Sequence, residues 1–177
     1  MLILASKSPR RRELLSLITT DFEIESADVD ETLPEGISPQ DAVEYLSRIK
    51  AEPFDNRADI VIGADTVVAV DGRILGKPSD RAQAAEMLRS LSGRYHSVFT
   101  GVTIIKPEKT VTFSVETRVK FFDLSETEIN NYTATGECDD KAGAYGIQGK
   151  GSLFVEKIDG DYFNVVGLPI SKLNKYL

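Results

Sequence analysis

Residues 60–75 read IVIGADTVVAVDGRIL and contain two apolar runs separated by small residues. The first run ends at an aspartate, Asp65, and the second ends in Asp71-Gly72. An Asp-Gly dipeptide between apolar runs is the strongest short signal of a two-residue hairpin turn. We therefore expect a buried strand that ends at Asp65 and is followed by a hairpin, with the aspartate at an interruption of the strand.

Helix and strand signals alternate on both sides of this hairpin. Capping residues mark four helix starts, near residues 8, 38, 79 and 125, and proline follows the first two. Further elements are expected as strands at 2–5 and twice within 97–122, a glycine-rich loop at 141–151, a hairpin at 153–166 and a last helix from 169. This mixture of helices with antiparallel hairpins predicts an α/β fold with a mixed sheet.

Composition and charge bound the class of protein. The chain has 177 residues, of which 41% are hydrophobic and 28% charged, as in folded globular proteins. We expect one domain over residues 1–177, built as one core or as two lobes over a cleft. The net charge of −7 argues against general binding of nucleic acid, which needs an excess of basic residues. The apolar run MLIL is too short for a signal peptide or a membrane span, so we expect a cytoplasmic protein without membrane contact.

Side-chain chemistry limits how a metal ion can bind. The chain has one cysteine, Cys138, and one histidine, His96, so it cannot assemble a Cys/His metal site. Any metal is therefore expected to have oxygen ligands. Cys138 and His96 themselves are interpreted as structural or incidental, because neither has an evident partner in the sequence.

Three arginines, Arg10, Arg11 and Arg12, fall in the opening turn of the first expected helix. The helix dipole already makes this end positive, so three cations there are locally unfavourable unless an anion binds. Guanidinium groups and free N–H groups suit phosphate oxygens. Because successive helix positions turn by about 100°, the three side chains cannot all face one ligand. A basic surface turn explains the segment equally well.

Asp65 and Lys77 form a second candidate group. A carboxylate between small residues could activate a water that attacks phosphorus, or bind the Mg²⁺ that accompanies a triphosphate. An aspartate that satisfies backbone N–H groups in a bulge is the more common alternative. Lys77 lies between glycine and proline, and the expected hairpin returns it close to Asp65. An acid and a phosphate-binding base would then meet, although a simple salt bridge fits the same spacing.

Three weaker candidates complete the set. The acidic loop that contains Glu31 could supply a second metal ligand, or could simply be solvated. Lys50 ends the second expected helix and could do no more than complement its dipole. Gln148, in the glycine-rich loop, carries a side-chain amide that is able to read a base edge.

Five longer segments of the chain occur in this order: SKSPRRRELL, VIGADTVV, GKPSD, LSGRYHSV and DKAGAYGIQGKGSLFVEKIDGDYFNVVGLPI. Together they closely resemble the Maf family of nucleotide pyrophosphatases, over nearly the whole chain. The resemblance implies a Maf or ITPase-like fold, in which helices flank a strongly curved mixed sheet and two lobes surround a nucleotide-binding cleft. It also implies hydrolysis of a nucleoside triphosphate to the monophosphate and pyrophosphate, with a divalent cation, Mg²⁺ or Mn²⁺.

The resemblance also implies roles for individual residues, carried over by position. The catalytic positions are Asp65 as the proton acceptor, Lys77 and Glu31. The substrate-binding and specificity positions are Ser6, Arg10, Arg11, Lys50, Thr66 and Gln148. Asp65 and Glu31 are also the candidate metal ligands. The AYGIQG loop around Gln148 matches the branch that resembles dTTP/UTP pyrophosphatases, which favours pyrimidine nucleotides.

Several points stay open at this stage. CTP and modified pyrimidine nucleotides are further candidate substrates. The family is tied both to the removal of non-standard nucleotides and to arrest of cell division at septum formation. A nucleotide-binding regulator of septum formation with little turnover is therefore one alternative, and a phosphatase that releases orthophosphate is another. A homodimer is also left open, because many relatives continue beyond the GLPISKL segment in a longer terminal helix.

Overall fold

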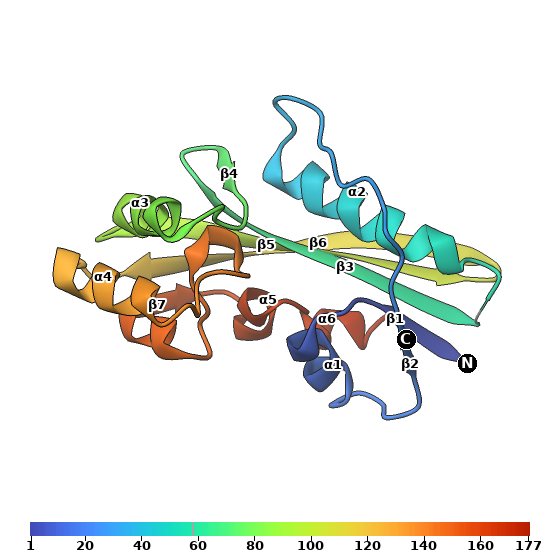
Figure 1. The fold of residues 1–177 in the computed structure, drawn as a ribbon. Coiled ribbons are helices and arrows are strands. Elements are labelled where there is room, and N and C mark those ends of the chain that lie inside the picture. Colours follow the sequence, from blue (N-terminus) through green and yellow to red (C-terminus); the bar gives the residue numbers. More distant parts are fainter. Residues whose placement is uncertain (58) are drawn as a thin grey trace.

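The computed structural model describes residues 1–57 and 59–177, and its centre is a seven-stranded mixed sheet (Figure 1). The strands follow the order β2 (Glu23–Glu25), β1 (Leu2–Ala5), β3 (Ile60–Val70), β5 (Tyr95–Lys106), β6 (Lys109–Phe121) and β7 (Val155–Asp159), with β4 (Arg73–Leu75) beside β3. β1 is parallel to β2 and β3, whereas the other pairs are antiparallel. The predicted α/β fold with a mixed sheet is therefore confirmed.

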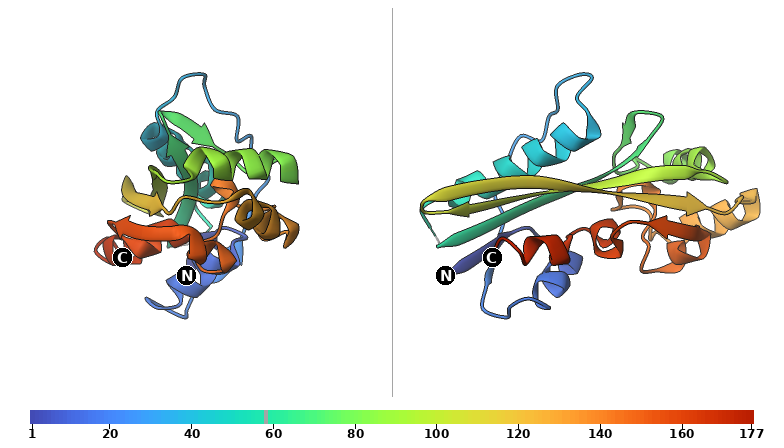
Figure 2. Two further views of the ribbon diagram at one scale, coloured as in Figure 1. Left: turned by 90° about the vertical axis from the view of Figure 1, so that its left-hand side faces the viewer. Right: turned by 180° about the vertical axis from the view of Figure 1, so that it is seen from behind.

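Helices flank this sheet on both sides. α2 (Pro39–Ala51) runs along one side of β3 and β5, and α1 (Pro9–Leu15), α5 (Tyr162–Val166) and α6 (Ile170–Leu173) lie on the other (Figure 1, Figure 2). α3 (Arg81–Leu91) packs against α4 (Glu126–Ala134) at one end of the long strands. Short 3₁₀ turns are η1 (Glu52–Phe54), η2 (Ala142–Ala144) and η3 (Lys150–Phe154). None of the helices in the described ranges is long and apolar enough to cross a membrane.

The four predicted helix starts are confirmed. In each case a side-chain oxygen accepts a backbone N–H group of the first turn, and these oxygens belong to Ser8, Ser38, Asp80 and Ser125. At α4 the full capping box forms, because the Ser125 N–H also donates to the Glu128 carboxylate at 2.8 Å. Capping is a local interaction, which is why the sequence alone locates these helix ends.

The main hydrophobic core lies between the sheet and α1, α3, α4 and the C-terminal helices. Its largest fully buried side chains are Leu4, Leu15, Ile62, Leu88, Leu91, Ile104, Phe121, Ile129, Leu168 and Leu173. A smaller apolar cluster fills the space beneath the end of α2 and consists of Ile3, Ala5, Ala51, Phe54, Val61 and Ile105. The sheet is thus covered on both faces, and α2 is the cover of its second face.

Two predictions about strands are wrong. β3 is one continuous strand of 11 residues, so Asp65 lies inside it rather than at its end or at an interruption. Residues 153–166 do not form a hairpin, since only β7 is a strand and the chain after Asp159-Gly160 forms α5. The Asp161 carboxylate starts this helix by accepting N–H groups of the next turn, at 2.8 Å from Phe163.

A buried asparagine fixes α5 in place. Asn164 donates its side-chain amide to the Val98 carbonyl and to the Thr117 hydroxyl, both at 3.0 Å. Its backbone carbonyl accepts a hydrogen bond from the Thr100 hydroxyl at 2.9 Å. Because β5 and β6 supply these partners, the segment forms a helix against their face rather than a strand at their edge.

His96 has a partner that the sequence did not reveal. Its side chain is only 3% exposed, its Nε2 lies 2.6 Å from the Tyr145 hydroxyl, and the Phe121 ring packs edge-on against it. Within the described residues, its Nδ1 has no hydrogen-bond partner. Burial lowers the pKa of His96 to about 4, so the imidazole is neutral in the folded protein near pH 7.

This burial predicts a loss of stability in mild acid. Between pH 6.5 and pH 4 the unfolded chain takes up a proton at His96 that the folded protein excludes, so the free energy of unfolding falls as the pH falls. Across this whole pH range, His96 lowers the free energy of unfolding by about 3 kcal/mol. Chemical unfolding at pH 7 and pH 4.5 measures most of this change. His96→Gln should lose markedly less stability than the wild type between these two pH values, and an equal loss in both proteins would contradict the assignment.

Candidate active site

The candidate site lies where β3 changes its neighbour. The ladder with β1 ends at the pair Ala5 and Gly63, and the ladder with β4 begins at the pair Val68 and Leu75. Residues 64–67 of β3 lie between the two ladders. A cleft of about 1340 Å³ opens at this point. The break predicted within β3 lies instead in the strands beside it, between β1 and β4.

The sequence-predicted residues come together in this cleft. The residues that line it include Ser6, Arg10, Arg11, Glu31, Lys50, Asp65, Thr66, Lys77 and Gln148. They come from the loop after β1, the first turn of α1, the acidic loop before α2, the end of α2, the middle of β3, the segment after β4 and the glycine-rich loop. The chain therefore converges on one site from segments that are far apart in sequence.

Lys50 is the ion-pair partner of Asp65. Its ammonium group contacts the Asp65 carboxylate directly and also lies 3.0 Å from a Glu31 carboxylate oxygen. Asp65 is 9% exposed, and α2 presents Lys50 from its last turn. Lys77 reaches the same cleft as expected, but the charge that meets Asp65 belongs to Lys50. Of the two readings left open for Lys50, the one in which it only complements its helix dipole does not hold, because it also pairs with two carboxylates.

Glu31 and Asp65 are the candidate ligands for a divalent cation. Their carboxylates converge on the Lys50 ammonium, which shows that this point of the cleft favours positive charge. Within the described ranges, no group of three or more histidine, cysteine, aspartate or glutamate side chains is placed to hold a metal ion. Mg²⁺ is commonly bound by one or two carboxylates together with substrate phosphates. Two carboxylates beside a cleft that is also lined by Arg10, Arg11 and Lys77 fit that mode.

Arg11 is held by uncharged partners. Its Nε donates to the Gly167 carbonyl at 2.8 Å, and its terminal nitrogens donate to the Thr66 hydroxyl at 3.0 Å and the Ser6 hydroxyl at 3.3 Å. Burial lowers the pKa of Arg11, and the charge of Asp65 opposes this shift. The guanidinium is thus fixed in direction while its charge is not neutralised by these partners. Such a group attracts an anion into the cleft.

The three arginines separate as helix geometry requires. Arg10 and Arg11 line the cleft, whereas Arg12 is exposed in the last turn of α1. The N-terminus of α1 lies at the cleft with them, since Ser8 and Pro9 also line it. Two cations and the first turn of a helix therefore face the same space. The alternative of a purely basic surface turn applies to Arg12 alone.

Asp65 and Thr66 point to opposite faces of β3, as consecutive strand residues do. Asp65 contacts Lys50 on the α2 side, while Thr66 contacts Arg11 on the α1 side. The Thr66 hydroxyl also lies 2.8 Å from that of Thr100 on β5. Because residues 64–67 lie between the β1 and β4 ladders, both side chains line one cleft. The strand thus divides an acidic half from an arginine half.

Asp140 and Lys141 are among the charged residues of the cleft wall that were not predicted from the sequence. Asp140 and Lys141 both line the cleft, and the Lys141 ammonium lies 3.0 Å from the Asp140 carboxylate. They open the longest segment quoted for the family resemblance, so their place in that segment was the available signal. Gln148 in the same segment is exposed at the cleft, where its amide is free to contact a ligand.

The fold defines an α/β protein of a known architecture. The Ham1 protein of Staphylococcus aureus superimposes with a TM-score of 0.59 at 17% identity, covering 99% of this chain and 96% of that one. A HAM1 protein from Coxiella burnetii gives a TM-score of 0.52 at 13% identity, covering the same shares. At these identities the likeness concerns the fold, and it confirms the expected class of mixed sheet.

The chain belongs to the Maf-like protein family, whose family model matches residues 1–177. It is 55% identical to the dTTP/UTP pyrophosphatase of Bacillus anthracis (strain CDC 684 / NRRL 3495), over 99% of this chain and 93% of that protein. It is 51% identical to the dTTP/UTP pyrophosphatase of Bacillus pumilus (strain SAFR-032), over 99% of this chain and 94% of that protein. The resemblance read from the sequence is therefore confirmed.

Proposed function

We propose that this protein is a nucleoside triphosphate pyrophosphatase that hydrolyses dTTP and UTP to the monophosphate and pyrophosphate. The observation that carries the proposal is the gathering of all nine sequence-predicted residues in one cleft. The names of the Bacillus relatives support the same activity and the same two substrates. CTP and modified pyrimidine nucleotides are further candidate substrates, which suits removal of non-standard nucleotides from the pool.

The triphosphate binds in the arginine half of the cleft. Arg10, Arg11 and Lys77 neutralise its oxygens. Arg11 needs little reorganisation, since its bonds to Gly167 and Thr66 already fix its direction. Phosphoryl chemistry depends mainly on such positioning and charge neutralisation. The net charge of −7 therefore does not prevent binding, because the local charge decides it.

Asp65 is the proposed proton acceptor. It takes a proton from a water that attacks the α-phosphorus, the bond to the bridging oxygen breaks, and pyrophosphate leaves with that oxygen. Lys50 holds the Asp65 and Glu31 carboxylates in one orientation. A divalent cation, Mg²⁺ or Mn²⁺, bound by Asp65 and Glu31 would supply further neutralisation of the phosphate charge.

Base recognition is assigned to the glycine-rich loop. Gln148 offers both an amide donor and a carbonyl acceptor, which suits the Watson–Crick edge of a pyrimidine. Thr66 and Arg10 are the other proposed specificity positions. The single domain, the cytoplasmic location, the absence of nucleic-acid partners and a homodimer stay predictions.

Product analysis tests this function. Purified protein is incubated with Mg²⁺ or Mn²⁺ and a panel of nucleoside triphosphates, and pyrophosphate is separated from orthophosphate. We expect pyrophosphate and the monophosphate in equal amounts from dTTP and UTP. Orthophosphate as the first product would reassign the chain as a phosphatase. Tight nucleotide binding without turnover would favour the regulator of septum formation.

A further inference from the structure

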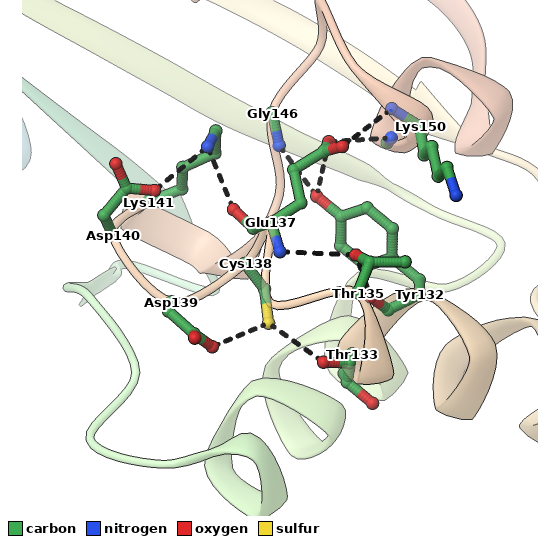
Figure 3. Close-up of polar contacts among 11 residues, drawn as sticks. Tyr132, Thr133, Thr135, Glu137, Cys138, Asp139, Asp140, Lys141, Gly146 and Lys150 are labelled. Carbon is green, nitrogen blue, oxygen red and sulfur yellow. Dashed lines mark hydrogen bonds and ion pairs between the residues drawn. The ribbon is translucent and has the colours of Figure 1, made fainter.

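Glu137 lies in the turn after α4 and binds the glycine-rich loop (Figure 3). One carboxylate oxygen accepts the Lys150 N–H at 3.0 Å, and the other accepts the Gly151 N–H at 3.2 Å. The Tyr132 hydroxyl donates to the same carboxylate at 3.1 Å and accepts the Gly146 N–H at 3.2 Å. Two side chains near the end of α4 thus hold three backbone N–H groups of one loop.

The loop also packs tightly against these groups. A Cβ atom added at Gly149 would lie 2.5 Å from the Glu137 carboxylate, and one at Gly146 would lie 2.5 Å from the Lys141 side chain. The Lys141 ammonium in turn donates to the Glu137 carbonyl at 2.9 Å. A side chain at position 149 would therefore displace the Glu137 carboxylate from its bonds with the loop. Glycine-rich backbone has high conformational entropy. Without the Glu137 carboxylate, this loop would therefore sample many conformations.

The hydrogen bonds from the loop and from Tyr132 stabilise the ionised carboxylate of Glu137. Burial works to raise the pKa of Glu137, but the N–H groups of Lys150 and Gly151 and the Tyr132 hydroxyl outweigh it and hold the pKa below its usual value. The charged form thus accepts all three bonds. Asp65, in contrast, directs its carboxylate to Lys50 in the other half of the cleft. The two acids therefore have different tasks.

Gln148 lies between the anchored positions. The bound N–H groups belong to Gly146 on one side of it and to Lys150 and Gly151 on the other. Gln148 itself is exposed and lines the cleft. We propose that Glu137 and Tyr132 are positioning residues for base recognition, which hold the loop so that Gln148 meets the pyrimidine in a fixed orientation. This proposal rests on the proposed function, because it concerns the nucleotide of that reaction.

Kinetics of Glu137→Gln and Tyr132→Phe test the proposal. A glutamine turns one of the two acceptor oxygens into a donor, which cannot accept a loop N–H. We expect kcat/KM for dTTP to fall about tenfold in Glu137→Gln, mainly through KM, with a smaller fall in Tyr132→Phe. The preference for dTTP over dATP should narrow in both. Inhibition by inorganic tripolyphosphate, which has no base, should be unchanged.

A double-mutant cycle shows whether Glu137 acts through Gln148. If it does, Glu137→Gln should add little to the loss already caused by Gln148→Ala. Additive losses would overturn the proposal, as would equally weakened inhibition by tripolyphosphate. Glu108→Gln, an exposed glutamate in the turn between β5 and β6, is the matched control and should behave as the wild type.

Hydrogen exchange tests the positioning without reference to activity. The amides of residues 146, 150 and 151 should exchange faster in Glu137→Gln than in Glu108→Gln, while the amides of β5 and β6 keep their protection. Unchanged exchange in the loop would overturn the proposal whatever the substrate is. A protein that turns over no nucleotide would instead refute the proposed function, and the exchange result would still decide whether Glu137 holds the loop.

Discussion

Asp65→Asn is expected to fold normally and to lose about a hundredfold or more of its turnover of dTTP, the scale of a lost general base. Asparagine has nearly the same shape, and its side-chain oxygen still accepts a hydrogen bond from Lys50, which contacts Asp65 in the wild type. It cannot take a proton from water. The loss should therefore appear in kcat, measured as pyrophosphate release at saturating dTTP.

Asp30→Asn is the matched control for this experiment. Asp30 belongs to the same acidic loop as Glu31, but it is exposed and its carboxylate accepts the Thr32 N–H at 2.9 Å. The control should keep turnover close to that of the wild type. Thermal unfolding of both variants separates a catalytic loss from a folding defect. Full turnover in Asp65→Asn would remove Asp65 from the mechanism and leave the cations of the cleft as a binding site.

The parts of the fold that the sequence predicted are those with local causes. The Asp71-Gly72 turn is confirmed, and both residues have the positive φ values, 52° and 71°, that a two-residue hairpin turn requires. The helix starts are likewise set by a side chain and the next few N–H groups. The mixed sheet was predicted from the mixture of helices and antiparallel hairpins along the chain. None of these predictions needed knowledge of a distant contact.

The errors arise from long-range packing. The small residues before Asp65 were interpreted as the end of a strand, yet Gly63 is small because α2 lies against it, where an added Cβ would overlap the Ser47 carbonyl oxygen. The ion pairs of Lys50 with Asp65 and Glu31 were not predicted for the same reason, since they depend on where α2 crosses β3. The strand β2, a short parallel neighbour of β1, has too few residues to show a pattern.

In the candidate site, too, the sequence predicted local features but not long-range contacts. Spacing alone paired Asp65 with Lys77 and left the arginines as a separate hypothesis, and each of the two had an ordinary structural alternative. Family resemblance joined them, and the structure then placed them in one cleft. Neither the spacing of residues nor the family resemblance pointed to Glu137, because its partners in the loop are backbone N–H groups 13 and 14 residues away. Backbone partners leave no side-chain pattern to find.

Gly101→Ala is expected to lower the free energy of unfolding by about 3 kcal/mol, at the upper end of the cost of overpacking. A Cβ atom at this position would overlap the carbonyl group of Val43 and lie 2.8 Å from the Glu44 nitrogen, both backbone atoms of α2. Backbone atoms cannot move aside as a side-chain end does, so the whole helix must shift. Chemical unfolding at pH 7 measures the effect.

Gly76→Ala is the control for stability, because its added Cβ meets nothing within 4 Å and its backbone has no positive φ. We expect its free energy of unfolding to stay within about 0.5 kcal/mol of the wild type. A similarly small change in Gly101→Ala would show that α2 shifts freely over the sheet, against the close packing described above.

The same substitution connects packing with the site. Gly101 is the register partner of Asp65 across β3 and β5, and the helix that lies on it carries Lys50 in its last turn. A shift of α2 therefore withdraws Lys50 from both of its carboxylate partners. Turnover of dTTP should fall in Gly101→Ala even at temperatures where the protein remains folded, which activity assays alongside circular dichroism would detect. Normal turnover in a folded Gly101→Ala would show that the contact between Lys50 and Asp65 does not depend on this packing.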